Sequence, residues 1–332
     1  MSPLVIRFIL VFFSLSSLSA YRIDELLDIE RNKVGEGPHW DVRTQSLYMV
    51  NKCPPKLIRY DYKTNKFHQC RFNFKVETAA FVIPIEDEPK KFAVGLDRKV
   101  AVVQWDGRSR TCRVKGYLFE VEGGLNRNFN SGKCDPQGRL FAGTECKVNS
   151  IGGIFRRPGS YLYKYDECGL LEVIETVRIA NGLAWDVNLA KMYHVDSAEF
   201  NIKVYNYDFK SGKVCDPEIA FDFVQYGKPL PYGMTIDTDG NLYVATFNGS
   251  RVYIIDPSFS SIKGTIDLPT KQITSCAFGG PNLDILYVTT GNRYENPPTG
   301  GKTYQVTGLG SRGYPMTNFK ATPDNSELKA FS

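Results

Sequence analysis

A repeated pair of short strand-like segments constrains the fold of this chain more than any other feature. In each pair an apolar segment follows a turn, and a second, often aromatic segment comes roughly ten to twenty residues later. The first segments are centred on Tyr48, Phe92, Phe141, Tyr193, Tyr243 and Tyr287, at steps of 44, 49, 52, 50 and 44 residues. A period of about 45 to 50 residues is typical of propellers, because one twisted four-stranded sheet cannot bury both faces until neighbouring sheets stack on it. The sequence therefore predicts an all-β fold, a six-bladed β-propeller.

The repeat also sets the limits of the predicted domain. The second segments fall at residues 58–62, 100–105, 161–165, 204–207, 251–255 and 303–306, and almost no segment shows a helical period. Tandem β-sandwich domains are the alternative to a propeller. We expect residues 21–33 to add a strand to the last blade, which would remove an exposed sheet edge. The propeller domain then spans residues 21–313, and residues 314–332 are expected to form a flexible C-terminal tail.

The first twenty residues read as a secretory signal peptide. Arg7 is followed by an apolar stretch at residues 8–13 and a run of small residues at 14–20, with no acidic residue. The alternative is a buried N-terminal helix or strand, since the apolar run is too short to span a bilayer. We therefore expect residues 1–20 to be removed near Ala20 and the mature protein to be secreted, extracellular and free of the membrane.

Composition narrows the classes of partner. The formal net charge is +5, and the basic residues are scattered among acidic ones, so we expect no nucleic-acid binding. Eight cysteines in an exported chain make disulfides plausible, with buried free thiols as the alternative. The triplet at residues 248–250 is a glycosylation sequon on Asn248. We expect a glycosylated monomer.

Three polar residues stand at comparable points of the repeat, where strands begin or end near the predicted axis. They are Glu36, Asn130 and Asn181. A carboxylate with amide oxygens forms a hard donor set, which suits calcium, magnesium or manganese better than zinc. The alternative is that these are turn residues whose side chains satisfy the backbone.

A set of motifs gives these residues a more specific context. It comprises Glu-Gly-Pro-x-Trp at 36–40, Gly-Lys-x-Asp-Pro-x-Gly-Arg at 132–139, Asn-Gly-Leu-x-Trp at 181–185, Tyr-x-x-Asp-Ser at 193–197, Gly-Met-x-Ile-Asp at 233–237 and Ser-Cys-x-Phe-Gly-Gly at 275–280. In order and spacing the chain resembles the regucalcin and gluconolactonase family, which includes senescence marker protein, and looks most similar to the insect luciferin-regenerating enzymes. The resemblance covers about residues 33–313.

The resemblance implies a divalent cation, calcium, zinc, manganese or magnesium, held by a glutamate, an asparagine and an aspartate, and hydrolysis of a small-molecule lactone. The glutamate corresponds to Glu36 and the asparagine to Asn181. The aspartate, which is also the implied general base, corresponds to Tyr232. A tyrosine ionises near pH 10, whereas an aspartate ionises near pH 4, so this exchange should weaken cation binding by orders of magnitude.

Positions that the resemblance assigns to the substrate are changed as well. Asn130 is kept, but Asn128 replaces an arginine and Ser131 replaces an aspartate. Glu145 stands where the family usually has an apolar residue, and we expect it to be a candidate for the missing carboxylate. If Glu145 supplies that carboxylate, its replacement by glutamine should weaken calcium or manganese binding.

Two functions remain open on this basis. The first is a secreted, metal-dependent lactonase or ester hydrolase with weakened or altered activity, which the retained Glu36, Asn181 and Asn130 favour. The second is a non-catalytic binding protein that presents its channel mouth to a small ligand or a protein, which Tyr232 and Asn128 favour. The fold alone does not decide between them.

Overall fold

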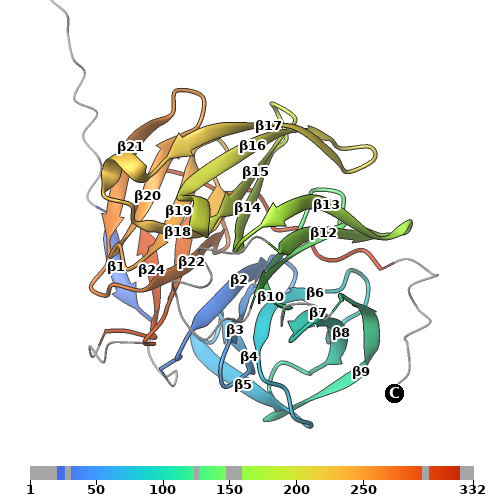
Figure 1. Cartoon of the computed structure of the whole chain (residues 1–332). Helices are drawn as coiled ribbons and strands as arrows, with labels where there is room; N and C mark the ends of the chain where they lie inside the picture. The colour runs from blue at the N-terminus through green and yellow to red at the C-terminus, as the bar shows by residue number, and fades with distance from the viewer. Residues whose placement is uncertain (1–20, 27–30, 123–126, 147–158, 294–298, 322–332) are drawn as a thin grey trace, which may run out of the picture.

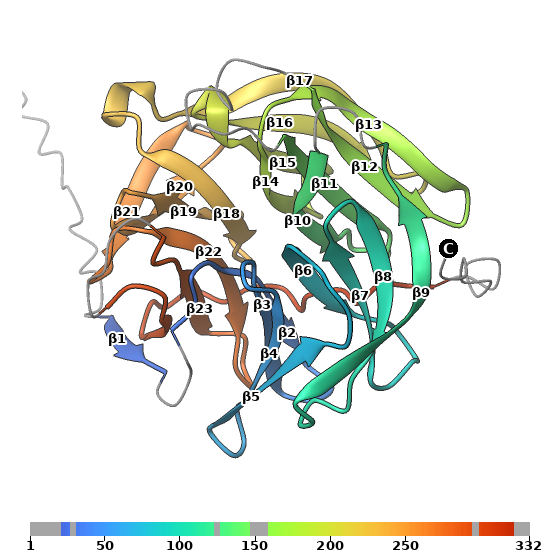
Figure 2. The ribbon, with the colours of Figure 1, turned by 60° about the horizontal axis from the view of Figure 1, so that its bottom comes forward.

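The computed structural model describes residues 21–26, 31–122, 127–146, 159–293 and 299–321, which form strands around a central axis (Figures 1 and 2). Three four-stranded antiparallel sheets follow one another in the middle of the chain. They comprise β10 (Arg127–Cys134), β11 (Leu140–Cys146), β12 (Ser160–Asp166) and β13 (Gly169–Val177); β14 (Ala180–Asp186), β15 (Lys191–Asp196), β16 (Asn201–Asp208) and β17 (Lys213–Asp222); and β18 (Leu230–Ile236), β19 (Leu242–Phe247), β20 (Arg251–Asp256) and β21 (Ser261–Asp267). In the described connections lie the short 3-10 helices η2 (Ser197–Glu199) and η3 (Val224–Tyr226).

A fourth four-stranded sheet joins the two ends of the described chain. It contains β22 (Ile273–Gly279), β23 (Ile285–Thr290), β24 (Thr303–Thr307) and β1 (Arg22–Glu25). β1 pairs antiparallel with β24 from Arg22 opposite Thr307 to Glu25 opposite Tyr304. The predicted addition of an N-terminal strand to the last sheet is therefore confirmed.

The prediction of six separate blades is wrong. The described residues form four sheets of four strands and one sheet of eight, in the order β2-β3-β4-β5-β9-β8-β7-β6. Its strands are β2 (Gly35–Asp41), β3 (Ser46–Asn51), β4 (Lys56–Asp61), β5 (Lys66–Phe72), β6 (Ala79–Pro84), β7 (Lys91–Leu96), β8 (Lys99–Gln104) and β9 (Thr111–Glu120). Two antiparallel runs are merged because β5 and β9 pair in parallel, Arg71 with Thr111 and Phe72 with Cys112. A disulfide between Cys70 and Cys112 ties the same two strands.

The predicted strand pairs themselves are confirmed. The first segments of the repeat coincide with β3, β7, β11, β15, β19 and β23, and the second segments with β4, β8, β12, β16, β20 and β24. Rings pack between neighbouring sheets: Trp40 stacks on Tyr287 with centroids 5.4 Å apart. The innermost strands β2, β6, β10, β14, β18 and β22 surround one central cavity. They approach closely, since a Cβ on Gly182 of β14 would lie 2.5 Å from the Cβ of Met234 on β18.

Residues 314–321, here called the strap, cross one end of this cavity (the red segment in Figure 2). Met316 lines the cavity and its sulfur accepts a hydrogen bond from the backbone N–H of Trp40 at 3.2 Å. Phe319 is completely buried, pairs in parallel with Ile85, and packs on Tyr165 at 6.2 Å. The expected flexible tail is therefore wrong for residues 314–321, because Phe319 fills a site between two sheets. Residues 322–332 lie outside the described part of the chain.

The expected signal peptide, residues 1–20, also lies outside the described residues. Within the described residues, no helix has the length and apolar character needed to cross a membrane.

Candidate functional site

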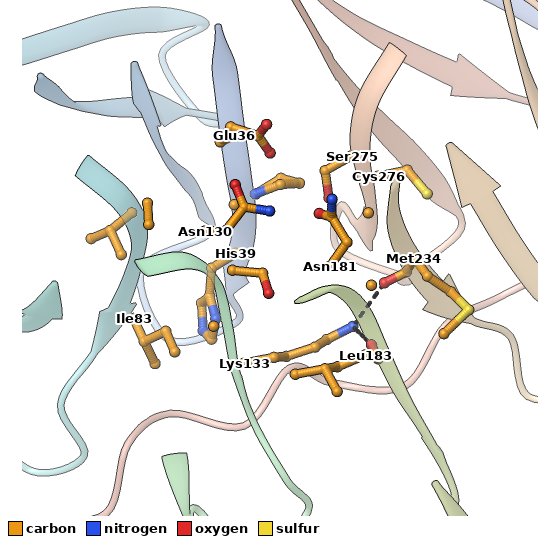
Figure 3. A pocket seen from close by; sticks show the side chains of 18 of the residues that line it. Glu36, His39, Ile83, Asn130, Lys133, Asn181, Leu183, Met234, Ser275 and Cys276 are labelled. Atoms are coloured by element: carbon orange, nitrogen blue, oxygen red, sulfur yellow. Dashed lines mark hydrogen bonds between the residues drawn. The ribbon is translucent and has the colours of Figure 1, made fainter. Parts of the chain in front are cut away.

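All six innermost strands contribute to a cavity of about 50 Å³. Glu36 on β2, Asn130 on β10 and Asn181 on β14 lie at one end of it, and Lys133 and Leu183 lie toward the other (Figure 3). The three polar residues named from sequence are thus brought together from strands far apart in the chain. We call this the cup end of the cavity, and the end crossed by residues 314–321 the strap end.

Each innermost strand is irregular where it passes the cavity. The strand ladders shift register between Glu36 and His39, between Phe129 and Ser131, between Ala180 and Leu183, and between Pro231 and Met234. Asn130, Asn181 and Tyr232 are residues that these shifts leave without a ladder partner. A bulge turns a side chain away from the regular alternation of a strand, and bulges concentrate next to functional sites. The local glycines at 37, 132, 182 and 233 favour these irregularities.

Glu36 is held in a dry environment. It is 3% exposed, and its Oε1 atom has no hydrogen-bond partner among the described residues. Burial raises its pKa from 4.5 to about 8; the positive charge of Lys52 opposes this rise and the negative charge of Glu145 adds to it. Burial thus favours the uncharged form of the Glu36 carboxyl group.

A lysine that the sequence analysis did not single out enters the same cup. Lys52 follows β3 directly, and its Nζ donates hydrogen bonds to Asn130 Oδ1 and, at 2.6 Å, to Glu145 Oε1. The lysine and glutamate side chains are 10% and 21% exposed. Asn130 is fixed from its other side, since its Nδ2 donates to the Ala180 carbonyl oxygen at 2.9 Å. The ammonium group thus takes up the amide oxygen of Asn130 and one oxygen of Glu145.

Tyr232 borders the cup as a neutral phenol. Its pKa is raised well above the usual 10, first by burial and then by the carboxyl groups of Glu36 and Glu145, while a hydrogen bond with Asn181 opposes the shift. Its ring stacks on Phe247 with centroids 5.4 Å apart and planes 28° apart. The residue at the implied aspartate position therefore contributes an aromatic face and no charge.

The remaining sequence candidates have local partners. Asn128 is buried, and its Nδ2 donates to Thr78 Oγ1 at 3.0 Å. Asn181 Nδ2 donates to Ser197 Oγ at 2.9 Å, so the amide oxygen of Asn181 can accept from other groups. Glu145 lies opposite Asn128 in the β10–β11 ladder and pairs with Lys52.

The residues of the cup do not fit a divalent cation. The described residues contain no group of three or more histidine, cysteine, aspartate or glutamate side chains that could hold a metal ion. The unpartnered Oε1 of Glu36 and the amide of Asn181 are donors such an ion would use, but the ammonium of Lys52 lies in the same cup. Two unit charges 4 Å apart interact by about 4 kcal/mol at an effective dielectric constant of about 20, and a dication would be repelled twice as strongly. Because Glu145 is taken up by its ion pair with Lys52, the cup offers a cation only the Glu36 carboxyl group, amide oxygens and a neutral phenol, a weaker donor set than two carboxylates.

Sequence reasoning missed Lys52 and Lys133. Lys133 is buried in the cavity wall, where its Nζ donates to the carbonyl oxygens of Leu183 and Met234 at 3.1 and 3.3 Å (dashed lines in Figure 3). Burial lowers its pKa from 10.5 to about 8. A signal for Lys52 existed: β2 and β3 form one hairpin with Glu36 opposite Val50, so Lys52, two residues after Val50, falls on the same face of the hairpin as Glu36.

Comparison with known proteins identifies relatives that cover most of the chain. The profile of the SMP-30/Gluconolactonase/LRE-like region matches residues 34–292. Regucalcin of Danio rerio is 32% identical over 299 residues, which cover 87% of this chain and 96% of that protein. The structure of a luciferin-regenerating enzyme superposes with a TM-score of 0.85 at 32% identity, covering 91% of this chain and all of that one. A calcium-binding protein, regucalcin, from Agrobacterium tumefaciens shares the fold, with a TM-score of 0.77 at 19% identity over 90% of this chain and 97% of the other.

Proposed function

The chain belongs to the SMP-30/gluconolactonase/LRE-like family, and on that premise we propose that it binds a small organic ligand at the cup end of its cavity without a divalent metal and without lactone hydrolysis. The observation that carries this proposal is the position of the Lys52 ammonium, bonded to Asn130 and Glu145 inside the cup. The positive charge of the site thus comes from a lysine side chain of the protein rather than from a metal ion.

The chemistry of the cup supports binding better than turnover. Lys52 offers a cation, Asn181 offers an amide and Glu36 offers a buried carboxyl group, so the cup can bind carbonyl or carboxylate oxygens of a ligand. Hydrolysis of a lactone also needs a base that takes a proton from water. At the position of the implied base stands Tyr232, whose pKa is raised well above 10. Lys52 can thus bind a ligand, but a neutral tyrosine, Tyr232, stands where the general base is expected.

A metal titration tests the proposal. Calcium, zinc, manganese and magnesium are titrated into the protein by calorimetry, and hydrolysis of a panel of aldonolactones is measured with each ion. We expect no binding stronger than a Kd of about 1 mM and no turnover above the uncatalysed rate. Binding tighter than this together with lactone hydrolysis would overturn the proposal and establish metal-dependent lactonase activity.

Two variants make the test specific. Lys52→Met combined with Tyr232→Asp removes the ammonium and restores the carboxylate, so manganese binding should appear at micromolar concentrations. Lys164→Met is a matched control, because Lys164 is an equally buried lysine paired with Asp166 at 2.9 Å outside the cup. If the double variant binds no metal although it keeps its fold by circular dichroism, Lys52 is not what excludes the cation.

We propose in addition that the protein is exported and glycosylated. The Cys70–Cys112 disulfide supports an oxidising compartment. Asn248 of the sequon is exposed in the turn between β19 and β20, where a glycosyltransferase could reach it. Expression in insect cells should release protein into the medium with a mass that falls on treatment with N-glycosidase, and Asn248→Gln should abolish that change. Retention of unglycosylated protein inside the cells would refute this proposal.

A further inference from the structure

A second and larger cavity, of about 470 Å³, lies next to the cup. We call it the outer cleft, and its described lining includes Tyr226, Tyr232, Phe247, Arg251, Tyr253 and Arg293. Glu145 also lines it, so the outer cleft reaches the ion pair of the cup. Its volume falls in the range of about 300 to 1,000 Å³ that small-molecule sites occupy.

One part of the lining is aromatic. The stacked pair of Tyr232 and Phe247 comes from the neighbouring strands β18 and β19. Tyr226, at the end of η3, is 40% exposed, and its ring is supported from behind by Phe221, with centroids 5.3 Å apart and planes 14° apart. Gly227 follows with φ of 82°, a left-handed conformation that directs the chain from η3 into β18. Packing therefore fixes the Tyr232–Phe247 pair and the ring of Tyr226 before any ligand binds.

The other part of the lining is cationic. The guanidinium of Arg251 lies 5.9 Å from the centroid of the Tyr253 ring. It pairs with Asp267 at 3.0 Å, but both side chains are well exposed, at 40% and 62%, and an exposed pair of this kind exchanges partners at little cost. Lys228 and Arg293 are the other cations of the lining. The positive charge of Arg293 acts on Tyr232, which places it close to the aromatic pair.

The balance of charge in the outer cleft favours an anion. Among the described lining residues, three are cationic and one, Glu145, is acidic. Glu145 is already neutralised by the Lys52 ammonium. Although Arg251 is paired with Asp267, cationic side chains outnumber acidic ones in this lining, so a ligand carboxylate placed there would be attracted, and charge-assisted hydrogen bonds to arginine are among the stronger polar contacts.

We propose that the outer cleft binds a planar aromatic anion, an aromatic ring system that carries a carboxylate. The ring packs against the Tyr232–Phe247 pair, and the carboxylate binds the cations supplied by Arg251, Lys228 and Arg293. This inference deepens the proposed function, because it names the ligand class for the same end of the cavity. The exchange of the implied aspartate for Tyr232 then has a positive role, since it adds an aromatic wall.

Three probes of matched size test the ligand class. Calorimetry is carried out with 2-naphthoate, with the neutral 2-naphthylmethanol and with the non-aromatic anion gluconate, all in EDTA. We expect 2-naphthoate to bind at least tenfold more tightly than either of the other two. Equal affinity for the alcohol would overturn the role of the cations, and equal affinity for gluconate would overturn the role of the rings. No binding of 2-naphthoate would refute the inference as a whole.

Variants then locate the probe. Phe247→Ala should weaken 2-naphthoate about tenfold, and Phe247→Leu, which keeps apolar volume without a ring, should weaken it almost as much. Arg251→Gln should weaken it several-fold and leave the alcohol unchanged. Arg312→Gln is the control, since Arg312 is an exposed arginine at the strap end, where its carbonyl accepts from Thr238. Unchanged affinity in both the Phe247 and Arg251 variants would place the probe elsewhere and overturn the inference.

The outcomes separate this inference from the proposed function. All probe titrations are done without metal, so a failure of 2-naphthoate to bind leaves the metal titration and the lactone assay standing. Conversely, metal-dependent lactonase activity would overturn the proposed function even if 2-naphthoate binds.

Discussion

The two ends of the central cavity are built from the same six strands but differ in the partners of their polar side chains. At the strap end, two buried side chains that line the cavity bond to neutral partners: His39 Nε2 donates to Asn318 Oδ1 at 3.0 Å, and Lys133 donates to two carbonyl oxygens. At the cup end, ionised side chains pair with each other, as Lys52 does with Glu145. Glu36 keeps an oxygen without a partner there.

This difference separates stability from binding. Backbone carbonyls cannot leave their positions, so contacts at the strap end hold the innermost strands together. A buried oxygen without a hydrogen-bond partner among the described residues, as in Glu36 at the cup end, costs free energy that a bound ligand can recover. We therefore expect substitutions at the strap end to change the free energy of unfolding and substitutions at the cup end to change binding.

The largest expected effect tests the strap itself. Phe319→Ala empties a completely buried site and should lower the free energy of unfolding by about 3 to 5 kcal/mol in urea denaturation. Phe259→Ala is the control, because Phe259 is 81% exposed and its loss should change stability by less than about 0.5 kcal/mol. Equal effects of the two substitutions would mean that the strap does not stabilise the fold.

The next effect concerns pH at the strap end. Burial lowers the pKa of His39 from 6.5 to about 4. Between these values the unfolded chain binds a proton that the folded chain does not, so the free energy of unfolding should fall as pH drops from 6.5 to 4, by roughly 1 to 3 kcal/mol. His39→Gln should remove this part of the acid sensitivity, measured by urea denaturation at a series of pH values. A wild-type pH profile retained in the variant would contradict the assignment.

A smaller effect is expected for the ion pair at the cup end. A double-mutant cycle with Lys52→Met and Glu145→Gln should give a coupling energy of about 1 kcal/mol that decreases in concentrated salt. The exposed pair Lys91–Glu88, at 3.0 Å, serves as comparison and should couple by less than about 0.5 kcal/mol. A coupling energy of zero at the cup would show that Lys52 and Glu145 do not act as a pair in solution.

The smallest effect is expected at Tyr232. Tyr232→Phe keeps the stack on Phe247 and should change the free energy of unfolding by about 0.5 kcal/mol or less. Tyr207→Phe should cost more, about 1.5 to 3 kcal/mol, because the Tyr207 hydroxyl donates to the buried Asp135 carboxylate at 2.5 Å near the strap end. Thermal denaturation of both variants compares the loss of stability at the two ends directly. A larger loss for Tyr232→Phe than for Tyr207→Phe would contradict the comparison.

The sequence predicted the strands well because the signals for strands are local. Alternating apolar residues and turn residues placed each of the twelve repeat segments on an observed strand. The pairing of β5 with β9 could not be predicted, since it joins the outer edges of two units and depends on their distance in space. The strap was missed for a similar reason: one phenylalanine in a polar stretch, Phe319, gives no period, and only the tertiary structure buries it.

The candidate site was predicted in part. Glu36, Asn130 and Asn181 lie around one cavity as expected, because residues at equivalent points of the innermost strands meet at the axis. The metal-binding and substrate-binding roles assigned to them stay predictions. Lys52 was missed because a lysine after a strand is ordinary on a surface, and only the β2–β3 hairpin shows that it points inward. The outer cleft was missed because Tyr226, Phe247 and Arg293 come from separate parts of the chain: η3, strand β19 and the segment after β23.

The strap also has a consequence for the order of synthesis. Residues 314–321 are translated after all the strands of the sheets. The sheets can therefore assemble while the strap end of the cavity is still open to water, and the strap closes that end last. A premature stop codon at residue 314 would leave each of those strands encoded and still uncover Trp40 and the groove that Phe319 fills. A nonsense allele at residue 314 should therefore behave as a loss-of-stability allele, although every strand of the sheets is still encoded.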